Sequence, residues 1–208
     1  MNHYKKSFTL LELIFTISII FIIVASIRFD FVSSSLSDAK NRIELYLNYT
    51  RYIAFLDNKY DPNDDDWKKR LWTLKFQKCS SSIGGLYFVV YSDKDTSTSH
   101  FKKEDCLKDP LTNKYLYSNW DCNPSGDESK YILLTKQYGI TKVNISCNTT
   151  STIGQISFGN DGKVYSSLGS TPSEIKEKCY ITLYDKDDNN ISLTIEPNSG
   201  YINGSNIK

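Results

Sequence analysis

The beginning of the chain lacks the two residues that most strongly break helices. No proline precedes Pro62 and no glycine precedes Gly84 in the 208 residues. Proline removes a backbone donor, and glycine loses the most conformational freedom on folding. Their absence leaves nothing that forbids one helix from about residue 8 into the fifties.

The chain also lacks the parts of common catalytic and cofactor sites. It has two histidines and no Cys-x-x-Cys pair, which argues against a zinc site. It contains no Gly-x-Ser-x-Gly elbow, no P-loop and no dinucleotide fingerprint. We therefore predict a protein that is not an enzyme and has no cofactor. A net charge of +1 gives no general attraction to nucleic acid, so we expect no direct nucleic-acid binding.

What the beginning of the chain does contain is an apolar run, Phe8–Ile27, which follows Lys5 and Lys6 and holds one charge, Glu12. A helix of this length, at about 1.5 Å per residue, would cross the roughly 30 Å hydrocarbon layer of a membrane. Lysines before the run favour a cytoplasmic N-terminus, so we expect a transmembrane segment over 8–28 with the rest of the chain outside. A secretory signal is the alternative, although its apolar core is usually about 7–15 residues long.

The same residues resemble a known processing site. Lys5-Lys6-Ser7 followed by Phe8-Thr9-Leu10-Leu11-Glu12-Leu13 is similar to the junction in type IV prepilins and type II secretion pseudopilins. The resemblance implies a leader over 1–7, cleavage between Ser7 and Phe8 by a prepilin peptidase, N-methylation of Phe8, and a role for Glu12 in filament assembly. Ser7 departs from the glycine that the family usually has before the cut.

Glu12 is the residue for which a membrane environment is least favourable. An ionised carboxylate in hydrocarbon costs several kcal/mol unless it is paired. The amino group that cleavage would free at Phe8 of a neighbouring subunit is a partner at matching depth, and this pairing would set the register between helices. The alternative is a Glu12 close enough to the membrane surface to be hydrated.

The segment 29–57 predicts an amphipathic continuation of the helix. Apolar positions recur there at steps of three and four residues, while charged side chains fall largely elsewhere. The stripe consists of Leu36, Ala39, Ile43, Tyr46, Leu47, Thr50, Ile53 and Ala54. Such a stripe must be covered, and the predicted cover is the β-rich domain that follows.

The remaining residues, 58–208, predict short strands separated by turns that contain glycine and asparagine. The predicted strands are Trp72–Cys79, Leu86–Tyr91, Tyr131–Thr135, Lys142–Cys147, Gln155–Phe158, Lys163–Ser166, Tyr180–Tyr184 and Ile191–Ile195. With the helix they predict an α+β, pilin-like fold, in which a long N-terminal transmembrane-plus-amphipathic helix packs on a mostly antiparallel β domain.

The end of the chain narrows the resemblance. Ile156–Val164 and Ile191–Ile202 are similar to the last hairpins of GspH/FimT-type minor pseudopilins. This implies a minor subunit of a type II secretion or type IV pilus-like filament machine, with DNA uptake in natural transformation as one use of such a machine. The resemblance implies as partners the prepilin peptidase/methyltransferase, other pseudopilins or pilins, inner-membrane platform proteins and membrane lipid. It also implies a single-pass protein of the bacterial inner membrane with a periplasmic C-terminal domain.

Two other functions are left open by the sequence. The first is a filament-tip receptor that itself binds DNA or a surface ligand. The second is a membrane-tethered periplasmic enzyme, for which the chain offers no recognisable catalytic motif.

All five cysteines follow the apolar run, in what would be an oxidising compartment. We predict two disulfides and one free thiol among Cys79, Cys106, Cys122, Cys147 and Cys179. Cys147–Cys179 is the favoured pair, because both cysteines flank strands of the predicted C-terminal sheet. The alternative is five buried, reduced cysteines.

One loop has part of the spacing of a calcium site. Oxygen-bearing side chains occur at positions 1, 3, 5 and 12 of such a loop, in Asp93, Asp95, Ser97 and Glu104, and Ser99 offers a backbone carbonyl at position 7. The sixth position, where the sharp turn needs glycine, is Thr98. We therefore expect an ordinary polar loop, with bound calcium as the alternative.

A basic cluster flanked by indole rings is the candidate contact with nucleic acid. It consists of Trp67, Lys68, Lys69, Arg70 and Trp72. Cations between stackable rings suit a single strand. Because the cluster is short and follows an acidic run, the favoured interpretation is a solvated face.

Overall fold

The structure, a computed structural model, describes residues 9–64, 66–95, 101–168 and 172–204, with the side chains of residues 25–34 excepted. By its internal contacts the chain forms two units, residues 1–35 and residues 36–208. Helix α1, Leu10–Leu56, contributes residues to both units.

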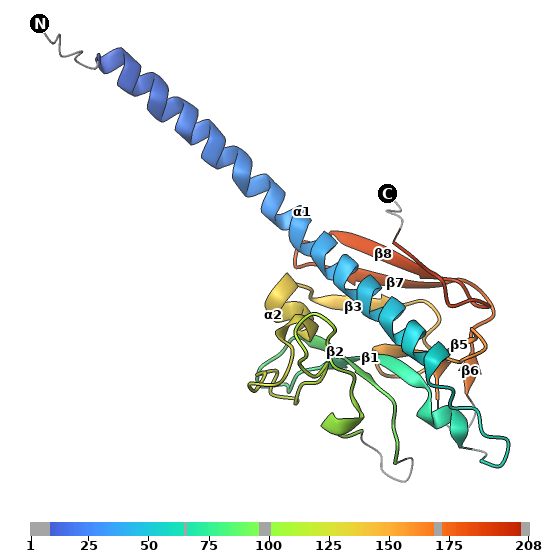
Figure 1. Cartoon of the computed structure of the whole chain (residues 1–208). Helices are drawn as coiled ribbons and strands as arrows, with labels where there is room; N and C mark the ends of the chain where they lie inside the picture. The colour runs from blue at the N-terminus through green and yellow to red at the C-terminus, as the bar shows by residue number, and fades with distance from the viewer. Residues whose placement is uncertain (1–8, 65, 96–100, 169–171, 205–208) are drawn as a thin grey trace, which may run out of the picture. The chain divides into compact units, whose positions relative to one another are not determined.

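After α1 the chain is built from short elements, which Figure 1 traces in chain order. The helical elements are η1 (Trp67–Arg70), η2 (Lys103–Asp105), η3 (Lys130–Ile132) and α2 (Leu134–Tyr138). The strands are β1 (Trp72–Lys78), β2 (Leu86–Tyr91), β3 (Lys142–Ile145), β4 (Gly154–Phe158), β5 (Val164–Ser167), β6 (Ser173–Glu174), β7 (Cys179–Tyr184), β8 (Asn190–Ile195) and β9 (Ile202–Asn203).

The strands form two antiparallel sheets. One sheet has the order β2-β1-β4-β5-β6, and the other has the order β3-β7-β8-β9. In the first, Phe76 of β1 lies opposite Phe88 of β2. In the second, Ile181 of β7 lies opposite Leu193 of β8. Antiparallel pairing allows one face of a sheet to pack on the core while the other face stays partly open.

The part of α1 from Leu36 onward lies against both sheets (Figure 1). The predicted stripe is buried: Leu36, Ala39, Ile43, Tyr46, Leu47, Thr50 and Ala54 are at most 8% exposed, and Ile53 is partly buried. The ring centroid of Tyr46 lies 5.4 Å from that of Phe88. Nε of Arg51 donates to the carbonyl oxygen of Ser199 over 2.9 Å. The predicted β-rich cover of this segment is confirmed.

One predicted strand is wrong. Residues 131–135 form the end of η3 and the start of α2 instead of a strand. Ile132, Leu133 and Leu134 are all buried, and a short apolar run of this kind is compatible with a buried strand or a buried helix. Gly139 ends α2 with a φ of +67°, and its N–H donates to the carbonyl oxygens of Leu134 and Thr135. The two-residue strands β6 and β9 were not predicted.

The predicted transmembrane segment and the single-pass inner-membrane location are also wrong, because no helix in the described part of the chain is long and apolar enough to cross a membrane. The apolar part of α1 whose side chains the structure describes, Leu10 to Val24, rises only about 22 Å along the helix axis. The hydrocarbon layer is roughly 30 Å thick. The same stretch includes the polar residues Glu12, Thr16 and Ser18. The α+β class with antiparallel sheets holds without a membrane-spanning helix.

Candidate functional site

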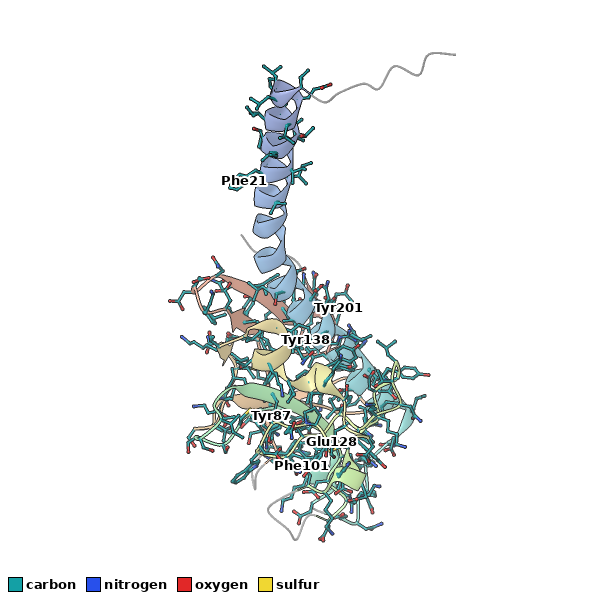
Figure 2. All side chains as sticks on the ribbon, turned by 90° about the vertical axis from the view of Figure 1, so that its left-hand side faces the viewer. Phe21, Tyr87, Phe101, Glu128, Tyr138 and Tyr201 are labelled. Carbon is teal, nitrogen blue, oxygen red and sulfur yellow. A yellow bond between two sulfur atoms is a disulfide. The ribbon has the colours of Figure 1, made fainter. Side chains whose placement is uncertain are left out.

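The candidate site is the first part of α1, residues 10–24, which is both apolar and exposed. Every large apolar side chain from Leu10 to Val24 is at least 49% exposed, and Phe21 reaches 76% (Figure 2). These side chains surround the helix instead of forming one stripe. A helix that is apolar on all sides is typical of a buried position, so this segment needs a cover.

The two hydroxyl residues of this segment are compatible with such a cover. Oγ1 of Thr16 donates to the carbonyl oxygen of Leu13 over 2.9 Å. Oγ of Ser18 donates to the carbonyl oxygen of Ile14 over 2.8 Å. Because each hydroxyl proton is used inside the helix, burying these side chains among apolar groups leaves no donor unpaired.

Glu12 takes part in the start of α1. Its Oε2 accepts hydrogen bonds from the backbone N–H and the hydroxyl of Thr9, each over 3.2 Å. In return, Oγ1 of Thr9 accepts from the backbone N–H of Glu12 over 3.3 Å. This is a capping box, with Thr9 at the N-cap and Glu12 at the third helical position. The Thr-x-x-Glu pattern is a readable helix-start signal in the sequence, in addition to the charge of Glu12.

Ser7 and Phe8, the predicted cleavage and methylation sites, lie outside the described residues. The pairing of Glu12 with an amino group at Phe8 of another subunit likewise stays a prediction. Within the described chain, the carboxylate has the Thr9 groups as its hydrogen-bond donors.

The cysteines form two disulfides. Cys147 is joined to Cys179, the pair that the sequence favoured, and Cys79 is joined to Cys122. Cys106 is free and buried. Burial raises the pKa of its thiol, and the carboxylates of Asp105 and Glu104 act in the same direction. A buried thiol held in its neutral form is a packing residue rather than a nucleophile.

Removing the Cys147–Cys179 bond should destabilise the second unit strongly. The bond closes a separation of 32 residues, for which the chain-entropy relation gives about 4 kcal/mol. We therefore expect Cys147→Ala/Cys179→Ala to lower the free energy of unfolding by this amount in urea denaturation. Cys106→Ala is the control, since it removes a buried sulfur without a cross-link and should cost about 1 kcal/mol. Equal losses in the two proteins would show that the cross-link contributes nothing.

The possible calcium loop is only partly described, because Ser97 and Ser99 lie outside the described residues. The carboxylate of Asp93 accepts from the backbone N–H of Asp95 over 3.1 Å. Nζ of Lys102 lies 3.8 Å from Oδ2 of Asp95. Burial raises the pKa of Asp93. Across the described residues no group of three or more His, Cys, Asp or Glu is arranged to hold a metal ion, and Glu104 belongs to η2.

The basic cluster around η1 is engaged by its own chain. Lys69 lies 2.8 Å from the carboxylate of Asp66, and Arg70 pairs with Asp64. Trp72 is 9% exposed, and its indole N–H donates to Asp57 over 2.8 Å. The rings therefore do not form one open platform.

The two remaining members of this cluster, Trp67 and Lys68, contact nearby aromatic rings. The Trp67 ring meets Tyr60 edge to face, with 5.2 Å between centroids. Nζ of Lys68 lies 5.6 Å from the centroid of the Trp67 ring and 5.9 Å from that of Tyr165. The five residues thus lie close together, but most of their charged and aromatic groups already contact other residues of the same chain.

Comparison with known proteins leaves the family open. No protein-family model matches the chain, and neither the curated proteins nor the solved structures give a match. The resemblance to pseudopilins therefore rests on the residues of this chain alone.

Proposed function

We propose that the protein is a minor pseudopilin, a subunit that assembles through residues 10–24 of α1 into a type II secretion or type IV pilus-like filament. The observation that supports this most is the exposed, apolar segment from Leu10 to Val24, which opens with a carboxylate at Glu12. DNA uptake is one use of such a machine.

The two parts of α1 differ in what covers them. From Leu36 onward the apolar stripe is buried by the sheets of the same chain. Residues 10–24 are exposed at every position. Exposing this much apolar surface is unfavourable by about 25 cal/mol per Å², so a cover from other molecules would stabilise the protein.

The cover that fits best is a bundle of like helices from other subunits. A surface that is apolar all round can contact several neighbours at once, whereas a single docking partner would need only a stripe. Each subunit carries one acid, Glu12, at the same position near the helix start, so this residue can set the axial register between neighbouring helices. The further partners are the processing peptidase and the platform proteins of the machine.

Processing at Ser7 tests this proposal directly. Intact-mass analysis of the protein from its native cells should show loss of residues 1–7 and one methyl group on Phe8. Ser7→Gly should be cut at least as completely, because it restores the glycine usual in the family. A charged and bulky replacement, Ser7→Arg, should block the cut. An N-terminus still at Met1, or a cut near Ser26, would contradict the assignment.

A further inference from the structure

The second unit contains a cleft of about 940 Å³ whose lining includes no residue of the exposed segment 10–24. Strands β1 and β2 contribute to its lining, with Lys75, Gln77 and Tyr87 among the residues. The hydroxyl of Tyr87 donates to Oε1 of Gln77 over 2.6 Å. Burial raises the pKa of Tyr87 to about 12, so this phenol keeps its proton. Figure 2 marks the region by Tyr87 and by Phe101, which also lines the cleft. Its volume is that of a ligand site rather than of a packing defect.

Trp120 lines the cleft and lies on a loop that is linked to the end of β1. The Cys79–Cys122 disulfide ties this loop to the residue that follows β1. The backbone N–H of Ser80 donates to the carbonyl oxygen of Trp120 over 2.7 Å. The indole is nonetheless 64% exposed. A large apolar ring is thus held open to solvent by a covalent bond and a hydrogen bond.

Residues 151–153, which also line the cleft, lie on a loop that the other disulfide holds. Cys147–Cys179 fixes the start of this loop to β7. The side-chain amide of Asn148 donates to the carbonyl oxygens of Thr150, Thr152 and Ile153 over 2.7–3.2 Å. Both loops are therefore held in place by the protein itself, so less conformational entropy is lost when a ligand binds.

The charged residues that line the cleft are all positive. Lys75, Lys78 and Lys142 line it, and among the described lining residues there is no Asp or Glu. Lys75 is half-buried and forms no ion pair or hydrogen bond with any residue that the structure describes. Burial lowers its pKa. An anion beside this ammonium would restore its preference for the charged form.

We propose that this cleft binds an acidic oligosaccharide, with Trp120 packed on one face of a sugar ring and Lys75 paired with a sugar carboxylate. The face of a pyranose ring presents C–H groups, which pack on an apolar aromatic surface. Gln77, Asn119 and Thr152, whose amides and hydroxyl are suited to sugar hydroxyls, line the same cleft as the indole. This inference does not depend on filament assembly.

A single strand of nucleic acid fits the cleft less well. Such ligands are bound by a series of exposed rings along a basic track. Here Trp120 is the strongly exposed ring, whereas the Tyr87 ring is buried and Phe101 stacks on Tyr91 with 4.0 Å between centroids. The near-neutral net charge of +1 is a further argument against it.

The test is a titration of the full chain with oligogalacturonate, followed by tryptophan fluorescence and by calorimetry. Neutral malto-oligosaccharide and a single-stranded oligothymidylate are titrated in parallel. We expect oligogalacturonate to bind, and to bind at least about tenfold more weakly to Trp120→Ala and to Lys75→Gln. Lys75→Arg should keep most of the affinity because it keeps the charge.

Two matched control variants lie at the other end of β4. Lys163→Gln removes one exposed charge in the β4–β5 turn, and Tyr201→Ala removes one exposed ring. Both should bind as the unmodified protein does. The proposal is overturned if oligogalacturonate does not bind, if its affinity is the same in Trp120→Ala and Lys75→Gln, or if oligothymidylate binds more tightly and depends on these two residues. Unchanged melting temperatures of the variants exclude misfolding as the cause of lost binding.

Discussion

Replacing Glu12 with Val is expected to abolish incorporation of the subunit into filaments. In a bundle of apolar helices, the Glu12 carboxylate would pair with the amino group at Phe8 of the next subunit. Val has no charge with which to form this pair. The change also removes the acid of the capping box, a feature that contributes about 0.3–1.5 kcal/mol of helix stability. The measurement is the amount of subunit in sheared filaments, by immunoblot, at equal expression in cells that lack the native gene.

Two milder variants separate the charge of Glu12 from its capping role. Glu12→Gln keeps a side chain that can accept from the Thr9 groups but loses the charge. Thr9→Ala loses the cap and keeps the charge. If charge pairing governs assembly, Glu12→Gln should fail as Val does and Thr9→Ala should assemble. If Glu12→Gln assembles normally while Thr9→Ala fails, the carboxylate acts as a cap and the pairing with Phe8 is wrong.

Replacing Tyr46 with Ala should cost the second unit about 3–5 kcal/mol, the range for deleting a large buried aromatic side chain. Tyr46 is fully buried and packs on Phe88. Its ring also lies under the guanidinium of Arg42, at 6.0 Å from the centroid. The measurement is urea denaturation of the oxidised protein, followed by circular dichroism. A loss below about 1 kcal/mol would mean that α1 contributes little to this core.

Tyr46→Phe is the matched control, because it keeps the ring and removes only the hydroxyl. That hydroxyl is buried beside Asp109 and Arg42, yet no described group forms a hydrogen bond of good geometry with it. Burial raises the pKa of Tyr46, and the nearby Asp109 adds to the rise. A buried polar group without a partner destabilises a protein by about 1–3 kcal/mol. We therefore expect Tyr46→Phe to be neutral or stabilising, and a loss comparable to that of Tyr46→Ala would show that the hydroxyl has a partner after all.

In one part of α1 the periodicity of the sequence predicts which face is buried, and in the other part it does not. The stripe from Leu36 to Ala54 was predictable because a helix repeats every 3.6 residues, so the sequence itself selects the buried face. In residues 10–24 the apolar side chains lie on all sides, and no such selection exists. Length and hydropathy then suggested a membrane span, which the described helix does not support.

Several features that join distant residues could not be predicted from the sequence. Cys79–Cys122 could not be singled out, because pairing depends on the approach of two Cβ atoms rather than on spacing along the chain. The residues from Tyr131 to Thr135 carry no period, so packing decided between strand and helix. The cleft is lined by residues from two loops, each held by a different disulfide.

The sequence by itself determined the local features of this protein: the long helix without Pro or Gly, its amphipathic second part, and seven of the nine strands found in the described residues. Each of these depends on neighbours within a few turns or on alternation along one strand. The tertiary structure alone decided the strand order, the disulfide at Cys79, and the meeting of Lys75 with Trp120 in one cleft. The physical reason is that these contacts join residues far apart in the chain, and their formation depends on the packing of the whole second unit.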